Sequence, residues 1–143
     1  MMERPLYRAL AEALARSKAM VFMSGPRQAG KTTLAKAVAG GYSASLYCNW
    51  DIREDRARLL KDPSFFTALD NPSAEAPLIV LDEIHKYRRW KNYLKGIYDA
   101  HADRYRFLVL CSGRLNIFQR VLDSLAGLYV MFSVLPFTIA ELM

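Results

Sequence analysis

The sequence predicts an α/β domain in which a parallel sheet is covered by helices on both faces. Five short apolar runs indicate strands, at residues 19–23, 45–49, 78–81, 107–110 and 129–134. Segments with helical spacing of apolar residues alternate with them, at residues 8–18, 31–38, 54–61, 89–100 and 116–125. Strands this apolar are typical of a parallel sheet that is buried on both sides. The length of 143 residues suits a single such domain.

The first half of the chain gives the clearest boundaries. Apolar residues at helical spacing fill residues 8–18, and Pro5 precedes them, where its fixed φ suits a first turn. The uniformly apolar run at 19–23 is typical of a strand buried on both faces. Residues 31–38 place leucine, alanine and valine on one face, and the glycine pair at 40–41 predicts the end of that helix.

The second half repeats the alternation with more polar connections. The apolar run at 45–49 leads into the highly charged helix at 54–61. Prolines and an asparagine then indicate a polar loop before the strand at 78–81. Each of the two remaining helices precedes a strand, which is the connection that parallel strands require.

Composition places the chain among globular proteins. Hydrophobic residues make up 52% and charged residues 24%, which excludes a disordered chain. The longest nearly uncharged stretch, residues 125–140, is too short for a spanning helix, and the charged N-terminus lacks the apolar core of a secretory signal. We therefore expect a cytoplasmic protein with no membrane partner. Cys48 and Cys111 lie in apolar runs and are expected to be inert core thiols.

A motif between the first strand and the second helix points to phosphate binding. It matches G-x-x-x-x-G-K-[ST] and consists of Gly25, Pro26, Arg27, Gln28, Ala29, Gly30, Lys31 and Thr32, followed by Thr33. Backbone N–H groups at this helix N-terminus are expected to surround a β-phosphate. Lys31 is expected to bridge the β- and γ-phosphates, Thr32 to bind Mg²⁺, and Thr33 to lie near the α-phosphate.

Two carboxylates follow the third strand, at the sheet edge where ligands of open α/β sheets bind. Asp82 and Glu83 form a Walker B pattern. We expect Asp82 to hold Mg²⁺ through water, and Glu83 to orient or deprotonate the water that attacks the γ-phosphate. An N-K-x-D guanine motif is absent from the sequence, which favours ATP over GTP.

Around these two motifs the sequence resembles a prokaryotic AAA-type ATPase family whose members read GPRQ-x-GKTTL and DEI-x-K. The matching segments are residues 24–34, 47–51, 78–90, 112–116, 124–127 and 135–137. The resemblance implies an ATP-binding P-loop domain, a three-layer fold with a five-stranded parallel sheet of order 5-1-4-3-2, and a polar sensor residue on the fourth strand. Ser112 is the candidate sensor.

The chain also departs from the family pattern. Asn116 stands where members commonly have aspartate, and Leu128 stands where they have an arginine that could stabilise transition-state charge. We therefore expect slow hydrolysis. Members usually continue into a long C-terminal region, whereas residues 1–143 cover the ATPase core alone, and Thr138 with Glu141 forms a capping box with almost no helix after it. We therefore expect a truncated domain that is prone to self-association and could form a homo-oligomer.

Three functions stay open at this point. Glu83 favours a Mg²⁺-dependent ATPase, while Leu128 favours a nucleotide-dependent binding module with negligible hydrolysis. The third is a nucleic-acid-associated ATPase, which the basic segment with interleaved aromatics favours. Its cations are Lys86, Arg88, Arg89 and Lys91, for which we expect a solvated helix face, with nucleic-acid binding as the alternative. The formal net charge of +6 is concentrated in this part of the chain.

Two polar residues near the motifs have ordinary interpretations. Asp51 follows a strand and precedes a charged helix, so we expect a helix cap there, with a position near the phosphates as the alternative. His85 follows Glu83 by two residues and is expected to be a capping or surface residue, with contact to the nucleotide as the alternative.

Overall fold

A computed structural model describes residues 5–16, 20–25, 30–69, 75–112 and 129–133. The strands are β1 (Met20–Ser24), β2 (Ser45–Asn49), β3 (Leu78–Asp82), β4 (Arg106–Cys111) and β5 (Tyr129–Ser133). The helices are α1 (Pro5–Arg16), α2 (Lys31–Ala39), α3 (Arg53–Lys61) and α4 (Trp90–His101), with short 3-10 turns η2 (Phe65–Ala68) and η3 (Ile84–Lys86). The helix expected at 116–125 lies outside the described residues.

The strands form one sheet in the order β2-β3-β4-β1-β5, and every pairing is parallel. The expected α/β class with a parallel sheet is therefore confirmed. The register aligns the carboxyl ends of neighbouring strands: Ser24 pairs with Cys111, and Asp82 pairs with Asn49 on one side and Leu110 on the other. Because these ends meet at one edge, the segments that follow β1, β2, β3 and β4 are brought together there.

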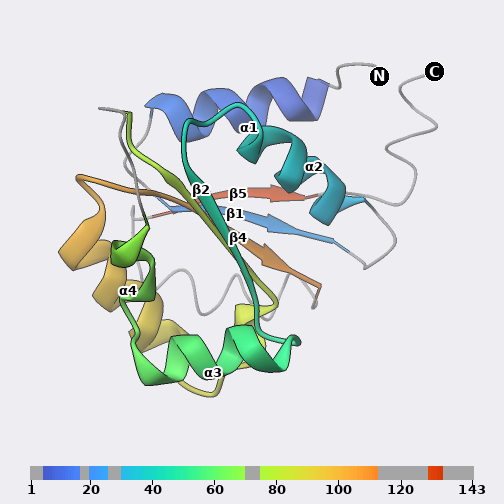
Figure 1. Ribbon diagram of the computed structural model, residues 1–143. Coiled ribbons are helices and arrows are strands. Elements are labelled where there is room, and N and C mark those ends of the chain that lie inside the picture. The colour runs from blue at the N-terminus through green and yellow to red at the C-terminus, as the bar shows by residue number, and fades with distance from the viewer. Residues whose placement is uncertain (1–4, 17–19, 26–29, 70–74, 113–128, 134–143) are drawn as a thin grey trace.

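Helices cover both faces of the sheet. Figure 1 shows α1 and α2 on one side, and α3 and α4 on the other. Along β4, Leu108 and Leu110 pack with the α1 and α2 side chains, whereas Phe107, Val109 and Cys111 belong to the cluster beneath α3 and α4. This alternation is the period of two that a strand imposes on its side chains. β1, β3 and β4 thus contribute side chains to two separate apolar layers, as their uniform apolar runs predicted.

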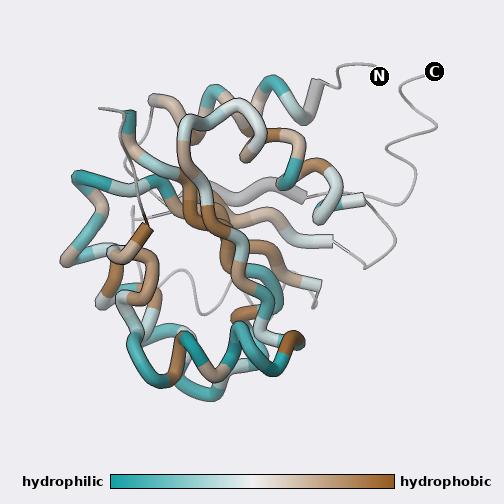
Figure 2. Tube along the Cα trace, viewed as in Figure 1, coloured by the Kyte–Doolittle hydropathy of each residue, from teal (hydrophilic) through white to brown (hydrophobic). Residues whose placement is uncertain are grey.

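Hydrophobic residues, including both cysteines, are concentrated in the central strands. Figure 2 shows hydrophobic colouring along the central strands and hydrophilic colouring along most of α3. Cys48 and Cys111 are buried free thiols, and burial raises the pKa of Cys48 to about 11 and that of Cys111 to about 12. Both cysteines are therefore protonated core residues at neutral pH, as expected. Within the described residues, each helix is too short or too polar to cross a membrane.

Candidate functional site

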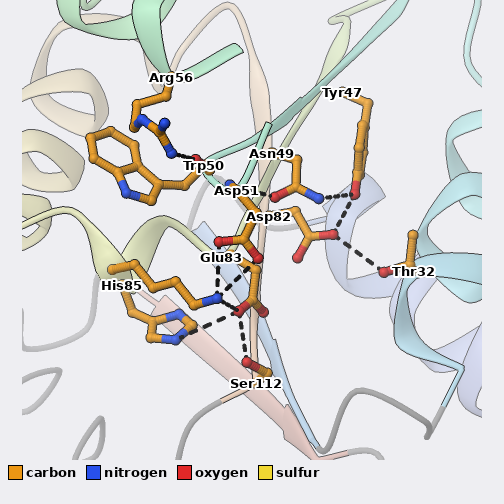
Figure 3. Close-up of polar contacts among 11 residues, drawn as sticks. Thr32, Tyr47, Asn49, Trp50, Asp51, Arg56, Asp82, Glu83, His85 and Ser112 are labelled. Atoms are coloured by element: carbon orange, nitrogen blue, oxygen red, sulfur yellow. Dashed lines mark hydrogen bonds and ion pairs between the residues drawn. The ribbon is translucent and has the colours of Figure 1, made fainter. Parts of the chain in front are cut away.

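A pocket of about 200 Å³ opens at the carboxyl edge of the sheet. Three segments that are distant in the sequence line it: the start of α2, the end of β2 and the end of β3. The lining residues are Lys31, Thr32, Asn49, Asp51, Asp82 and Glu83. Figure 3 shows the carboxylates of Asp51, Asp82 and Glu83 gathered between the strand ends. The two sequence motifs therefore face one another across a single cavity.

The described part of the phosphate-binding motif has the backbone that such a loop needs. Gly30 precedes α2 with φ 85° and ψ 16°, a left-handed conformation that glycine adopts without steric cost. The N–H of Gly25 donates to the Cys111 carbonyl at 3.1 Å, which ties the start of the loop to β4. Lys31 is only 2% exposed, so its ammonium is held inside the pocket rather than in solvent. Residues 26–29, predicted to complete the loop, lie outside the described residues.

Two side chains donate hydrogen bonds to the carboxylate of Asp82, and a third side chain holds one of these donors. The Thr32 hydroxyl donates to Oδ2 at 3.2 Å, and the Tyr47 hydroxyl donates to the same oxygen. Asn49 Nδ2 in turn donates to the Tyr47 hydroxyl at 3.1 Å. Tyr47 and Asn49 were not predicted as site residues, although their spacing by two on β2 places both side chains on the same face of the strand.

The electrostatics of Asp82 favour a bound cation. Burial raises the pKa of Asp82, and the hydrogen bond from Tyr47 opposes this rise. The negative charge of Glu83 raises the pKa further. The negative charge of an ionised Asp82 is therefore only partly balanced by its neighbours, and a cation would stabilise it. A hydroxyl and a carboxylate are oxygen donors of the kind that Mg²⁺ prefers, and Mg²⁺ usually keeps several water or phosphate ligands. This two-residue set of oxygen donors fits Mg²⁺ bound together with phosphates.

Glu83 is held by contacts on both its backbone and its side chain. It has φ 58° and ψ 26°, and its N–H donates to the Leu110 carbonyl at 2.9 Å. On the side chain, Oε1 accepts a hydrogen bond from Ser112 Oγ at 2.7 Å and lies 3.1 Å from Lys86 Nζ. Burial alone would raise the pKa of Glu83, but the Ser112 and Lys86 donors outweigh burial, and the pKa is lowered. The predicted sensor therefore contacts the predicted base directly.

His85 lies at the edge of this group. Its Nε2 is 3.9 Å from Glu83 Oε1, and its side chain is largely buried. Burial lowers the pKa of His85, the negative charge of Glu83 opposes that change, and Lys86 reinforces it. A neutral imidazole at physiological pH follows. The expected surface or capping role does not describe this largely buried position beside Glu83.

Asp51 and Lys86 depart from their predicted roles. The N-cap residue of α3 is Ile52, which makes no side-chain cap hydrogen bond, so the expectation of a helix cap at Asp51 is wrong. Instead, Lys86 Nζ donates to both carboxylate oxygens of Asp51, at 2.9 Å each. Lys86 is therefore bound by two carboxylates. It is itself exposed, as are the other cations of the basic segment, Arg88, Arg89 and Lys91.

Comparison with known families identifies the type of domain. A family profile described as "AAA domain" matches residues 17–143. The chain belongs to the AAA domain family. This AAA domain is of the P-loop ATPase type that its two motifs predicted, and the resemblance noted from the sequence is confirmed. A comparison with curated protein sequences gives no significant match.

Solved structures share the fold of this AAA domain at low sequence identity. AMPPCP-bound DnaA from Aquifex aeolicus has a TM-score of 0.56 and 16% identity, with 89% of this chain and 44% of that chain covered. The Walker-type ATPase PABY2304 of Pyrococcus abyssi has a TM-score of 0.58 and 15% identity, with 94% of this chain and 53% of that chain covered. C. elegans PCH-2 has a TM-score of 0.54 and 18% identity, with 91% of this chain and 40% of that chain covered. The AAA domain thus spans about half or less of the length of these proteins.

Proposed function

We propose that this AAA domain binds ATP with Mg²⁺ in the pocket at the carboxyl edge of the sheet and slowly hydrolyses the β–γ bond. One observation carries the proposal: Lys31, Thr32, Asp82 and Glu83, which come from two separate motifs, line the same cavity. A buried ammonium at a helix N-terminus suits an anion, and the neighbouring carboxylates suit the cation that accompanies it.

The residues divide the work between binding and reaction. Lys31 donates to oxygens of the β- and γ-phosphates, and the backbone N–H groups at the start of α2 add further donors. Thr32 and Asp82 hold the metal ion, with Asp82 oriented by Tyr47. Mg²⁺, when bound, supplies positive charge that stabilises the phosphate oxygens.

Glu83 acts on the water. Its carboxylate accepts a hydrogen bond from the attacking water and takes the proton as the new O–P bond forms, while the β–γ bond breaks and ADP leaves. Ser112 donates to Glu83 and fixes the direction of the carboxylate. Leu128, which lies outside the described residues, offers no positive charge to the transition state, and this supports a slow reaction.

Calorimetry with Mg²⁺ and a non-hydrolysable ATP analogue tests the binding step. Lys31→Ala removes the buried ammonium and should weaken binding at least about tenfold, since charge-assisted hydrogen bonds contribute about 1.5–3 kcal/mol. Lys61→Ala, at an exposed position at the end of α3, is the matched control and should bind as the parent does. Equal affinities for Lys31→Ala and the parent would remove the phosphate loop from the proposal.

A single-turnover assay with radiolabelled ATP tests the reaction. Glu83→Gln should lower the rate by about 10²-fold or more, the usual contribution of a general base, and should leave analogue affinity unchanged. Binding without turnover in the parent would instead support the nucleotide-dependent binding module. Equal rates for Glu83→Gln and the parent would show that Glu83 is not the base.

A further inference from the structure

An ion-pair bridge links two strand ends beside the pocket. Lys86 Nζ lies 2.9 Å from both carboxylate oxygens of Asp51 and 3.1 Å from Oε1 of Glu83. Asp51 belongs to the connection after β2, whereas Glu83 directly follows β3. The side chain of Glu83 is 6% exposed, and those of Lys86 and Asp51 are 35% and 39% exposed. The bridge therefore extends from the protein surface to the buried carboxylate.

The backbone at Glu83 explains how Lys86 reaches it. Among the described residues, Glu83 is the only non-glycine with positive φ. Glutamate rarely adopts this left-handed conformation, and such strain persists only where surrounding contacts determine it. The Lys86 N–H donates to the Glu83 carbonyl at 3.1 Å, which closes the 3-10 turn η3 and returns the Lys86 side chain to the Glu83 carboxylate. The strained turn and the ion pair are thus two parts of one arrangement.

The contacts on Glu83 are unequally divided between its two oxygens. Ser112 and Lys86 both donate to Oε1, so rotation of the carboxylate is restricted from two directions. Oε2 is then the oxygen suited to accept a hydrogen bond from a water in the pocket. Three carboxylates line this pocket, namely those of Asp51, Asp82 and Glu83, and their repulsion would otherwise turn the Glu83 side chain away.

We propose that Lys86, anchored by Asp51, is a positioning residue for Glu83: it fixes Oε1 so that Oε2 can orient the attacking water. The inference rests on the proposed hydrolytic function and names a residue that this function alone does not require. Lys86 is not among the residues that line the pocket, so it acts through Glu83 rather than on the nucleotide.

An exposed ion pair away from the pocket provides matched control variants. Lys95 and Asp99 form an ion pair of 3.1 Å on α4, with both side chains more than half exposed. Lys95→Met removes the same functional group as Lys86→Met, and Asp99→Asn matches Asp51→Asn. Neither control residue contacts the pocket, so both controls should hydrolyse ATP at the parental rate.

The experiment measures single-turnover rates and analogue affinities for the full chain. Lys86→Met should lower the rate about tenfold or more, the equivalent of losing one hydrogen bond to a charged group, with affinity changed less than about twofold. Lys86→Arg should restore part of the rate, and Asp51→Asn should lower it less than Lys86→Met does. In the Glu83→Gln background Lys86→Met should have no further effect, because both substitutions remove the same oriented carboxylate.

Several results would overturn the inference. An unchanged or faster rate in Lys86→Met, with Glu83→Gln still inactive, would leave the proposed function intact and remove the positioning role. Additive effects in the double variant would do the same. A parent that binds the analogue but does not hydrolyse ATP would overturn both proposals. If Lys86→Met fails to fold, the rates of Asp51→Asn and Lys86→Arg decide by the same criteria.

Discussion

The hydroxyl of Tyr47 gives a quantitative test of the site without any nucleotide. Tyr47→Phe removes one oxygen atom, which donates to Asp82 Oδ2 and accepts from Asn49 Nδ2. A hydrogen bond to a charged group contributes about 1.5–3 kcal/mol, and a neutral one about 0.5–1.5 kcal/mol. Water from the pocket can replace part of this, so we expect a loss of about 2 kcal/mol in the free energy of unfolding, out of a typical total of about 5–15 kcal/mol.

Urea unfolding followed by circular dichroism measures this loss. The midpoint should fall with an unchanged m-value, since the phenyl ring still fills its place. Tyr98→Phe is the control, because the Tyr98 hydroxyl makes no hydrogen bond with any described residue, and it should change stability by less than about 0.5 kcal/mol. If Tyr47→Phe were no more destabilising than Tyr98→Phe, the contact with Asp82 would contribute nothing, and our account of how Asp82 is oriented would be refuted.

Three further predictions concern pH, packing and nucleic acid. Burial raises the pKa of Asp82, so the folded state binds this proton more tightly than the unfolded state and loses stability as the pH rises above 3.8 towards the folded pKa. Asp82→Asn should remove that loss and make the nucleotide-free protein more stable at pH 7 in urea unfolding; a less stable variant would contradict the sign. Phe66→Ala should cost about 3–5 kcal/mol in the same assay, because Phe66 is 0% exposed, and a cost below about 1 kcal/mol would show that the site collapses around the smaller residue. If Arg88, Arg89 and Lys91 bind DNA phosphates, replacing all three with glutamine should reduce the slope of log affinity against log salt by about 3, and an already flat slope in the parent would exclude the interface.

The sequence alone predicts the parts of the fold that repeat locally. Runs of apolar residues predicted β1 to β4 to within a residue or two of their observed ends. For β1, β3 and β4 the reason is that a strand buried on both faces needs apolar side chains at almost every position, whereas β2 is mostly partly exposed. The convergence of Lys31 and Asp82 was predictable for a related reason: parallel strands end at the same edge of a sheet. The start of α1 was predicted three residues late, since Pro5 is already helical.

Other contacts depend on geometry that residue types do not reveal. Asp51 and Lys86 are 35 residues apart, and local sequence favoured a helix cap for the first and a solvated helix face for the second. Their pairing requires the left-handed backbone at Glu83, a conformation that glutamate rarely adopts and that no residue pattern indicated. Tyr47 was missed because its position in a strand is equally typical of a core aromatic.

The hydrogen bonds at the end of β4 determine where this domain can tolerate changes in length. Two consecutive carbonyls of this strand accept from different loops: Leu110 from the N–H of Glu83, and Cys111 from the N–H of Gly25. Inserting one residue into β4 would shift both anchor points together and turn the following side chain, Ser112, to the opposite face. Insertions and deletions that preserve activity should therefore be found in exposed connections, such as residues 40–44 between α2 and β2, and not in the middle strand of the sheet.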